Sequence, residues 1–208
     1  MILAHPIAGL TITSLIKKHV GKLNSKQEIV FWLVGITSSV LPDFDLVYAL
    51  LWSKENHHTL LTHTPFFYLI IGLILSIGLF IWEIIIKKYK KNITKKKLNE
   101  EIQKITFIEI LIIIFLINTI IHILLDFPAG SISPFWPIYS ESLSLIKISS
   151  QNWIKSYIQS PAIILEIFWM IAGIVVIITT TKTKAFRYAT LYTLFWTVVA
   201  GILMLLLI

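Results

Sequence analysis

Long apolar stretches are the feature of this sequence that most limits its fold. Residues 65–86, 105–125 and 186–208 form runs long enough to cross a bilayer, which takes about 20 helical residues. Residues 161–179 form a slightly shorter run, bounded by a proline and the polar segment TTTKTK. Residues 2–16 and 29–41 are shorter still, so each fits either a span or half of a re-entrant hairpin. We therefore predict an all-α, polytopic membrane helix bundle of about six membrane segments, with the first two short or re-entrant.

Composition agrees with a membrane protein. Hydrophobic residues make up 56% of the 208 residues and charged residues only 14%, against about 25% charged in a soluble domain. The length indicates a single membrane-embedded domain, residues 1–208. The N-terminus has no basic region and no A-x-A-like cleavage site, so we expect it to be retained. Without cysteine, any metal must be held by histidine and carboxylate ligands.

Basic residues predict the orientation of the segments. The lysine-rich run KKYKKNITKKK, residues 87–97, lies between two apolar stretches. If it is cytoplasmic, alternation of the segments places 15 of the 18 basic residues inside, which the positive-inside rule favours. Both termini are then outside. We expect no nucleic-acid partner despite the net charge of +7, because juxtamembrane lysines normally set topology or meet anionic lipid.

Histidines and aspartates collect at the opposite face. On the same topology, all three aspartates and five of the six histidines fall at the outer ends of the segments; they are His5, Asp43, Asp45, His57, His58, His63, His122 and Asp126. His19 lies inside among lysines. The convergence does not depend on whether the first two segments cross the bilayer. Ionisable clusters at a membrane are usually functional, so we predict a metal site here.

Spacing within the cluster indicates how an ion could be held. His122 and Asp126, in HILLD, are four residues apart and would share one face of a helix. The two aspartates of LPDFD are two residues apart, so one can ligate while the other orients a ligand histidine or bridges ions. Nitrogen and oxygen ligands without sulfur suit zinc, and also manganese or iron.

The sequence resembles the YdjM-like family of membrane-bound metal-dependent hydrolases. The family pattern is an early His, L-P-D-x-D, H-R-x-x-T-H-S, H-x-x-x-D and a Pro/Gly stretch with W-P. Here these elements are His5, LPDFD, HTLLTHT, HILLD and FPAGSISPFWPI, all within residues 1–140. Two further membrane helices are expected in residues 161–208. Thr59 replaces the usual arginine, a natural anion clamp, and His57 would compensate.

This resemblance implies a metal centre and a reaction. The family is distantly similar to zinc-dependent phospholipase C and zinc single-strand nucleases, which hold clustered zinc ions with His and Asp. The implied metal ligands here are His5, Asp45, His58, His63, His122 and Asp126. Asp126 would bridge if two ions are bound; one or two are expected, since Glu141 and Glu166 lack suitable neighbours for a third site. The implied catalytic residues are Asp43, Asp45 and His58, with Asp43 or Asp45 as the base.

We therefore expect an enzyme of the inner membrane of a bacterial or archaeal cell. It would hydrolyse a phosphoester of a lipid or lipid-linked substrate at the extracytoplasmic face, using metal-activated water. The aromatic residues of the segment after HILLD suit the headgroup level of the bilayer.

Three other interpretations are weaker. A metal or proton transporter would need ionisable residues along a path to the inside, and Glu83, Glu109 and Glu166 all lie near segment ends. A scaffold would leave the His/Asp cluster without a role. An intramembrane zinc protease is disfavoured because H-E-x-x-H is absent.

Overall fold

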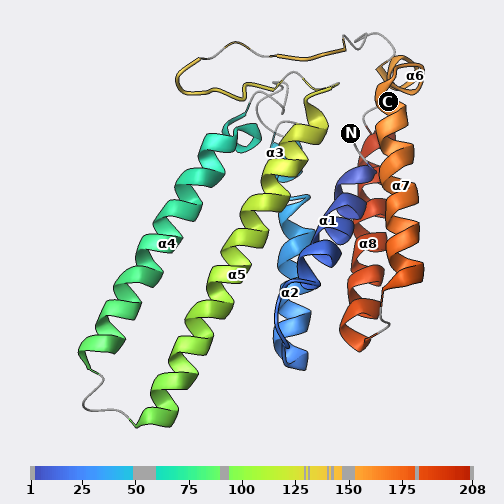
Figure 1. Ribbon diagram of the computed structural model, residues 1–208. Helices are drawn as coiled ribbons and strands as arrows, with labels where there is room; N and C mark the ends of the chain where they lie inside the picture. Colours follow the sequence, from blue (N-terminus) through green and yellow to red (C-terminus); the bar gives the residue numbers. More distant parts are fainter. Residues whose placement is uncertain are drawn as a thin grey trace.

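The computed structural model is a bundle of helices, as the apolar stretches predict (Figure 1). It describes residues 3–48, 60–89, 94–128, 130, 132–139, 141, 143–146, 153–180 and 183–206. The elements are α1 (Ala4–Lys17), α2 (Ser25–Ser38), η1 (Pro42–Phe44), α3 (Asp45–Tyr48), η4 (Leu61–His63), α4 (Pro65–Lys88), α5 (Lys95–Asp126), α6 (Trp153–Ile158), α7 (Ala162–Thr179) and α8 (Lys184–Leu206). Within these ranges the only β pairing is an isolated bridge between Ile132 and Leu143.

Four helices are long and apolar enough to cross a membrane, namely α4, α5, α7 and α8. They coincide with the four longest apolar stretches of the sequence. Helix α5 begins ten residues before the expected residue 105, because Thr94 caps it by accepting a hydrogen bond from the backbone N–H of Lys97. The expected short helix in the loop of residues 127–160 is α6.

Helices α1 and α2 form a hairpin, one of the two arrangements expected for the short apolar runs of residues 2–16 and 29–41. Each has 14 residues and is about 21 Å long. The hairpin packs between α5 on one side and α7 and α8 on the other (Figure 1). Gly35 of α2 lies directly against the side chain of Thr13, and Gly173 of α7 against Ile7, so the helix axes approach closely. A hydrophobic core of Leu10, Phe31, Trp32, Ile36, Ile114 and Phe186 fills the space around the hairpin.

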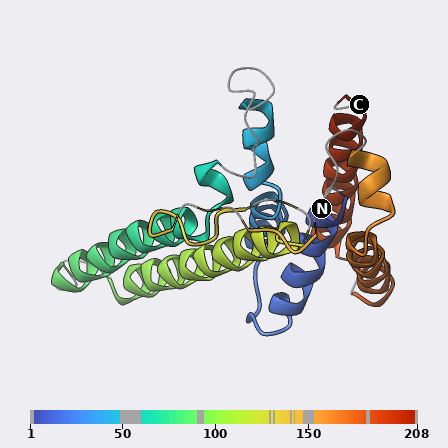
Figure 2. The same cartoon turned by 90° about the horizontal axis from the view of Figure 1, so that it is seen from above.

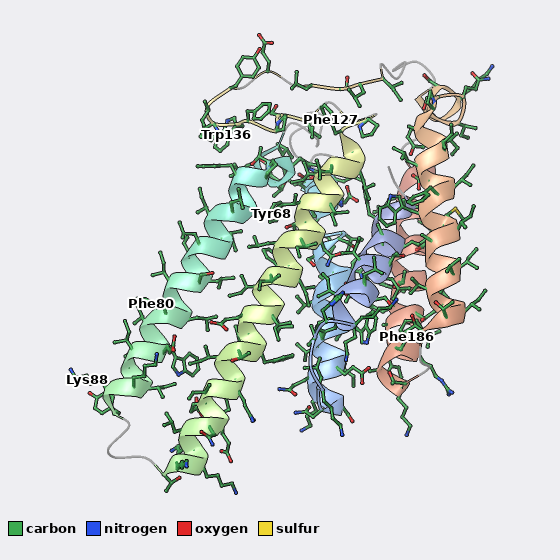
Figure 3. The ribbon with its side chains drawn as sticks, in the orientation of Figure 1. Tyr68, Phe80, Lys88, Phe127, Trp136 and Phe186 are labelled. Carbon is green, nitrogen blue, oxygen red and sulfur yellow. The ribbon has the colours of Figure 1, made fainter. Side chains whose placement is uncertain are left out.

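The bundle has two chemically different ends. The connections between α1 and α2, between α4 and α5, and between α7 and α8 all lie at one end, and both chain termini lie at the other (Figure 1). The lysine-rich loops of the sequence therefore share one end, as the topology prediction requires. Helices α4 and α5 slant away from the remaining helices as a pair (Figure 2), and side chains such as Phe80 on α4 point outward, where lipid would cover them (Figure 3).

Candidate metal centre

Five residues from four separate elements meet at the end opposite the lysines. His5 lies in the first turn of α1, Asp43 in η1, and His63 at the end of η4, while His122 and Asp126 form the last turn of α5. Local sequence explains two of these positions. Pro42 begins the short 3₁₀ turn that presents Asp43, and Thr64-Pro65 ends η4 and begins α4, so His63 is held between two helices.

His5, Asp43, His122 and Asp126 form a group that could hold a metal ion. Each offers one ligand atom, and these atoms all lie within 4.8 Å of one another. His5 joins the two carboxylates from one side. Its Nδ1 is 3.1 Å from Oδ2 of Asp43, and its Nε2 is 3.2 Å from Oδ1 of Asp126.

The other oxygens of the same two carboxylates face His63 and His122. Nε2 of His122 is 3.5 Å from Oδ1 of Asp43 and 3.1 Å from Oδ2 of Asp126. Nε2 of His63 is 3.7 Å and 3.6 Å from those same two oxygens. Ligands about 2.0–2.1 Å from a tetrahedral zinc ion are separated by about 3.3–3.4 Å. The four nitrogen–oxygen separations bracket this value, as expected of donors around one ion.

The far nitrogens of two imidazoles are fixed by hydrogen bonds. Nδ1 of His122 donates to the backbone carbonyl oxygen of Ser39 at 2.7 Å. Nδ1 of His63 donates to Oδ2 of Asp45 at 2.8 Å, and the hydroxyl of Thr62 donates to that same oxygen. A proton on Nδ1 leaves the lone pair on Nε2, which is the tautomer that a metal ligand requires.

Buried polar atoms provide a second test of the fit. Among the described residues, Nε2 of His5 and Nε2 of His122 are buried without a hydrogen bond. Each of these nitrogens faces a carboxylate oxygen of Asp126, at 3.2 Å and 3.1 Å, and a cation shared between nitrogen and oxygen would bind both. The two rings lie 3.8 Å apart between centroids, so both nitrogens belong to one small space.

Opposite charges at the centre shift the pKa values of Asp43 and His63. Burial raises the pKa of Asp43, but the imidazoles of His122 and His5 outweigh it and hold that pKa well below its usual range. Burial lowers the pKa of His63, yet the carboxylates of Asp126, Asp43 and Asp45 raise it well above the ordinary value. The carboxylate of Asp43 therefore stays ionised, as a metal ligand must be, and an ion that binds Nε2 of His63 would displace a proton from it.

The two aspartates of LPDFD divide the roles that the sequence left open between them. Asp45, expected as a metal ligand or as the base, binds Nδ1 of His63, on the ring edge opposite the centre. Asp43, expected as a candidate base, is the aspartate that faces the centre. The 3₁₀ turn that carries Asp43 packs against α5 and η4, and α3 begins at Asp45.

Other predicted residues lie near the centre or beyond the described ranges. His5, His63, His122 and Asp126 are brought together. His57, His58 and Thr59 fall outside the described residues, so the predicted roles of His58 stay predictions. Glu141 accepts a hydrogen bond from Tyr139, and Glu166 accepts one from Tyr157. Neither belongs to the group of possible ligands among the described residues.

Two partners of the centre were not foreseen from sequence. The carbonyl of Ser39 carries no side-chain signal, and only the folded chain brings it to His122, 83 positions away. Thr62 had a weak signal in its position directly before His63.

Comparison with known proteins identifies the family. The chain matches the YdjM inner membrane protein family over residues 1–206. No curated protein and no solved structure matches it. The family match covers nearly the whole chain and includes every residue of the centre, so this protein belongs to the YdjM inner membrane protein family.

Proposed function

We propose that this protein is a membrane-embedded, metal-dependent hydrolase that cleaves a phosphoester of a lipid or lipid-linked substrate. The observation that carries the proposal is the cluster of His5, Asp43, His63, His122 and Asp126, in which histidine nitrogens lie 3.1–3.7 Å from oxygens of the two carboxylates. Zinc is the proposed metal, since nitrogen and oxygen donors without sulfur suit it. His5 completes the centre by contacting the outer oxygens of both carboxylates.

A bound divalent cation would supply Lewis acidity, activating water and neutralising charge on phosphoryl oxygens. The protein supplies the positioning. Asp45 and the carbonyl of Ser39 orient the two ligand histidines. Asp43 has a side chain that is 30% exposed, whereas those of His5, His63, His122 and Asp126 are fully buried. Asp43 is therefore the donor of the centre that an incoming substrate meets first.

The surroundings of the centre support a lipid as the proposed substrate. The centre lies at the ends of apolar membrane helices, so a molecule arriving through the bilayer reaches it without leaving the membrane. Exposed Phe44 follows Asp43 in η1, and the exposed Trp136 lies at the same end of the bundle (Figure 3). We place this end on the extracytoplasmic side, because the lysine-rich loops lie at the other end.

The experiment follows hydrolysis by purified, zinc-loaded protein: release of the phosphorylated headgroup from short-chain phospholipids, and of phosphate from lipid-linked phosphates. We expect turnover that a chelator abolishes and zinc restores. Asp43→Asn keeps the shape of the side chain but removes the charge of a donor, so bound zinc and turnover should both fall. Lys97→Gln, remote from the centre, is the matched control. No release from any substrate by protein that contains zinc would reject the proposal.

A second candidate function is transport of a metal ion or proton. Buried polar side chains continue from the centre towards the lysine end: the amide of Asn118 contacts the hydroxyl of Thr13 at 3.4 Å, and Ser14 contacts Thr180 at 3.1 Å. Flux of zinc or protons into liposomes by protein that is inert as a hydrolase would favour this function.

A further inference from the structure

The level of the centre within the bundle can be measured against α7. Two contacts fix the register of α1 on α7: Ile7 lies against Gly173, and the hydroxyl of Ser14 is 3.1 Å from that of Thr180. Both pairs are 166 positions apart, so the helices run in parallel and His5 lies level with residue 171. Helix α7 begins nine residues earlier, at Ala162. It therefore extends about 14 Å beyond the centre.

Helix α8 gives the same result independently. Glu28 contacts Thr183, and Thr37 contacts Tyr192, both at an offset of 155 positions. The ring of Phe44, next to Asp43, packs on Trp196 with centroids 5.3 Å apart. Helix α8 continues ten residues beyond Trp196, to Leu206, which is about 15 Å.

The parts of α7 and α8 that extend beyond the centre carry an apolar surface. Ile164 is 65% exposed, and Ile167, Phe168, Val198 and Ile202 are also more than half exposed. The only charged residue of α7 is Glu166, and it is buried. Monomeric soluble surfaces rarely show apolar patches of this extent. The surface is continuous with the lipid-facing sides of the same two helices, so acyl chains are its natural partner.

A loop on the opposite side of the centre also exposes large apolar side chains, with Glu141, hydrogen-bonded to Tyr139, as the charged residue among its described positions. Residues 132–139 and 143–146 cross above the start of α4 and the end of α5 (Figures 1 and 2). Ile132 anchors this loop by packing against Tyr68 and Ile123. Around that anchor Ile138 is 90% exposed, and Phe135 and Leu145 are largely exposed. Trp136 lies above α4, far from Lys88 at the lysine end (Figure 3).

The length of the α1–α2 hairpin agrees with a submerged centre. The hairpin runs from the centre to the loop with Lys18 and Lys22, a height of about 21 Å. The hydrocarbon core of a bilayer is about 30 Å thick. If the centre lay at the surface, these lysines would end inside the hydrocarbon. These lysines reach water on their own side of the bilayer when the centre lies about 9 Å inside the hydrocarbon boundary on the other side.

We propose that the centre is submerged below the headgroups of its leaflet, and that residues 132–139 and 143–146 form a membrane-inserted cover above it. The partner of this cover, and of the upper parts of α7 and α8, is the lipid of that leaflet. The surface is formed by Phe135, Ile138, Leu145, Ile164, Phe168 and Ile202. This inference concerns the membrane alone and does not depend on the proposed reaction.

The test is the depth of single spin labels, which the absence of native cysteine makes direct. Cysteines at Ile138, Ile164 and Ile171 are labelled in the full-length protein, reconstituted in phosphatidylcholine–phosphatidylglycerol vesicles. Relaxation of each label by oxygen, which concentrates in lipid, is compared with relaxation by chromium oxalate, which stays in water. Lys97→Cys, at the lysine end, is the water-exposed control.

We expect the ratio of oxygen to chromium oxalate relaxation to be several-fold higher at positions 138 and 164 than at 97. The ratio should be highest at 171, which is level with His5. All four positions are exposed in the structure, so the labels do not disturb packing. A ratio at 138 or 164 equal to that at 97 would overturn the proposal, since either result places water at the level assigned to lipid.

Discussion

At the scale of single residues, the two aspartates of LPDFD, separated by one phenylalanine, have different roles. Asp43 points to the centre and is partly exposed, whereas Asp45 is buried behind His63. The motif LPDFD therefore combines a group of the centre with a group that orients a ligand. Such an outer partner raises the basicity of the imidazole and restricts its rotation.

Replacement of His122 should remove the metal. We expect His122→Ala to lower bound zinc in elemental analysis, because Nε2 of His122 faces both Asp43 and Asp126. His19→Ala is the matched control, since His19 lies at the lysine end beyond α1. Equal zinc content in the two purified variants would contradict the assignment.

Replacement of Asp45 should weaken metal binding without abolishing it. In Asp45→Asn the side chain still reaches Nδ1 of His63, but the charge that polarises the imidazole is lost. Outer partners of this kind typically contribute about 10–100-fold in affinity. Competition with a chelator of known zinc affinity measures the change. A loss as complete as that of His122→Ala would show that Asp45 is itself a ligand.

At the scale of elements, the hairpin depends on close approach of its helices. A methyl group added at Gly35 would overlap Oγ1 and Cγ2 of Thr13, on the neighbouring helix. Thr13 is itself fully buried and cannot easily move away. The hairpin carries His5 at one end and leads into η1, so its packing also sets the positions of two groups in the centre.

Gly35→Ala should therefore destabilise the fold. Overpacking of this kind typically costs about 1–3 kcal/mol. Gly78→Ala is the control: it is also within a helix, but no atom lies within 4 Å of the added methyl group. Thermal unfolding in detergent micelles should show a lower transition temperature for the first variant only. Equal transition temperatures would mean that the hairpin relaxes without cost.

The sequence predicted most elements because hydrophobicity decides them. The four long apolar stretches became α4, α5, α7 and α8, and His122 and Asp126 came together because helix geometry relates residues four positions apart. The roles of Asp43 and Asp45 could not be predicted, since they depend on a 3₁₀ turn whose direction tertiary packing sets. The contact of Ser39 with His122 depends on how α2 packs against α5, which residue patterns do not encode.

At the scale of the whole molecule, the positive charges and the candidate metal centre lie at opposite ends of the bundle. The lysine-rich loops occupy one end and the candidate metal centre the other (Figure 1). Because cytoplasmic loops are enriched in lysine and arginine, this separation predicts which side each end faces.

Labelling of single cysteines in intact cells measures the orientation. An impermeant maleimide should label cysteine at Gln159, before the start of α7 on the side of the centre, and should not label cysteine at Lys97 until the membrane is opened. Both residues are exposed in the structure, so access decides the result. Labelling of position 97 in intact cells would reverse the orientation and place the centre on the cytoplasmic side.

A submerged centre also predicts which phosphoesters are cleaved. A water-soluble phosphoester would have to leave water to reach Asp43, whereas a bilayer lipid is already at that depth and only its polar group must move. We therefore expect zinc-loaded protein in vesicles to hydrolyse a long-chain lipid phosphoester at least 10²-fold faster, per bound zinc, than p-nitrophenyl phosphate.

Ile138→Asp, which puts a charge into the cover far from the metal ligands, should reduce turnover of the lipid while bound zinc stays constant. Equal rates on the two substrates would show that the centre opens to water, even if the hydrolase activity itself is present.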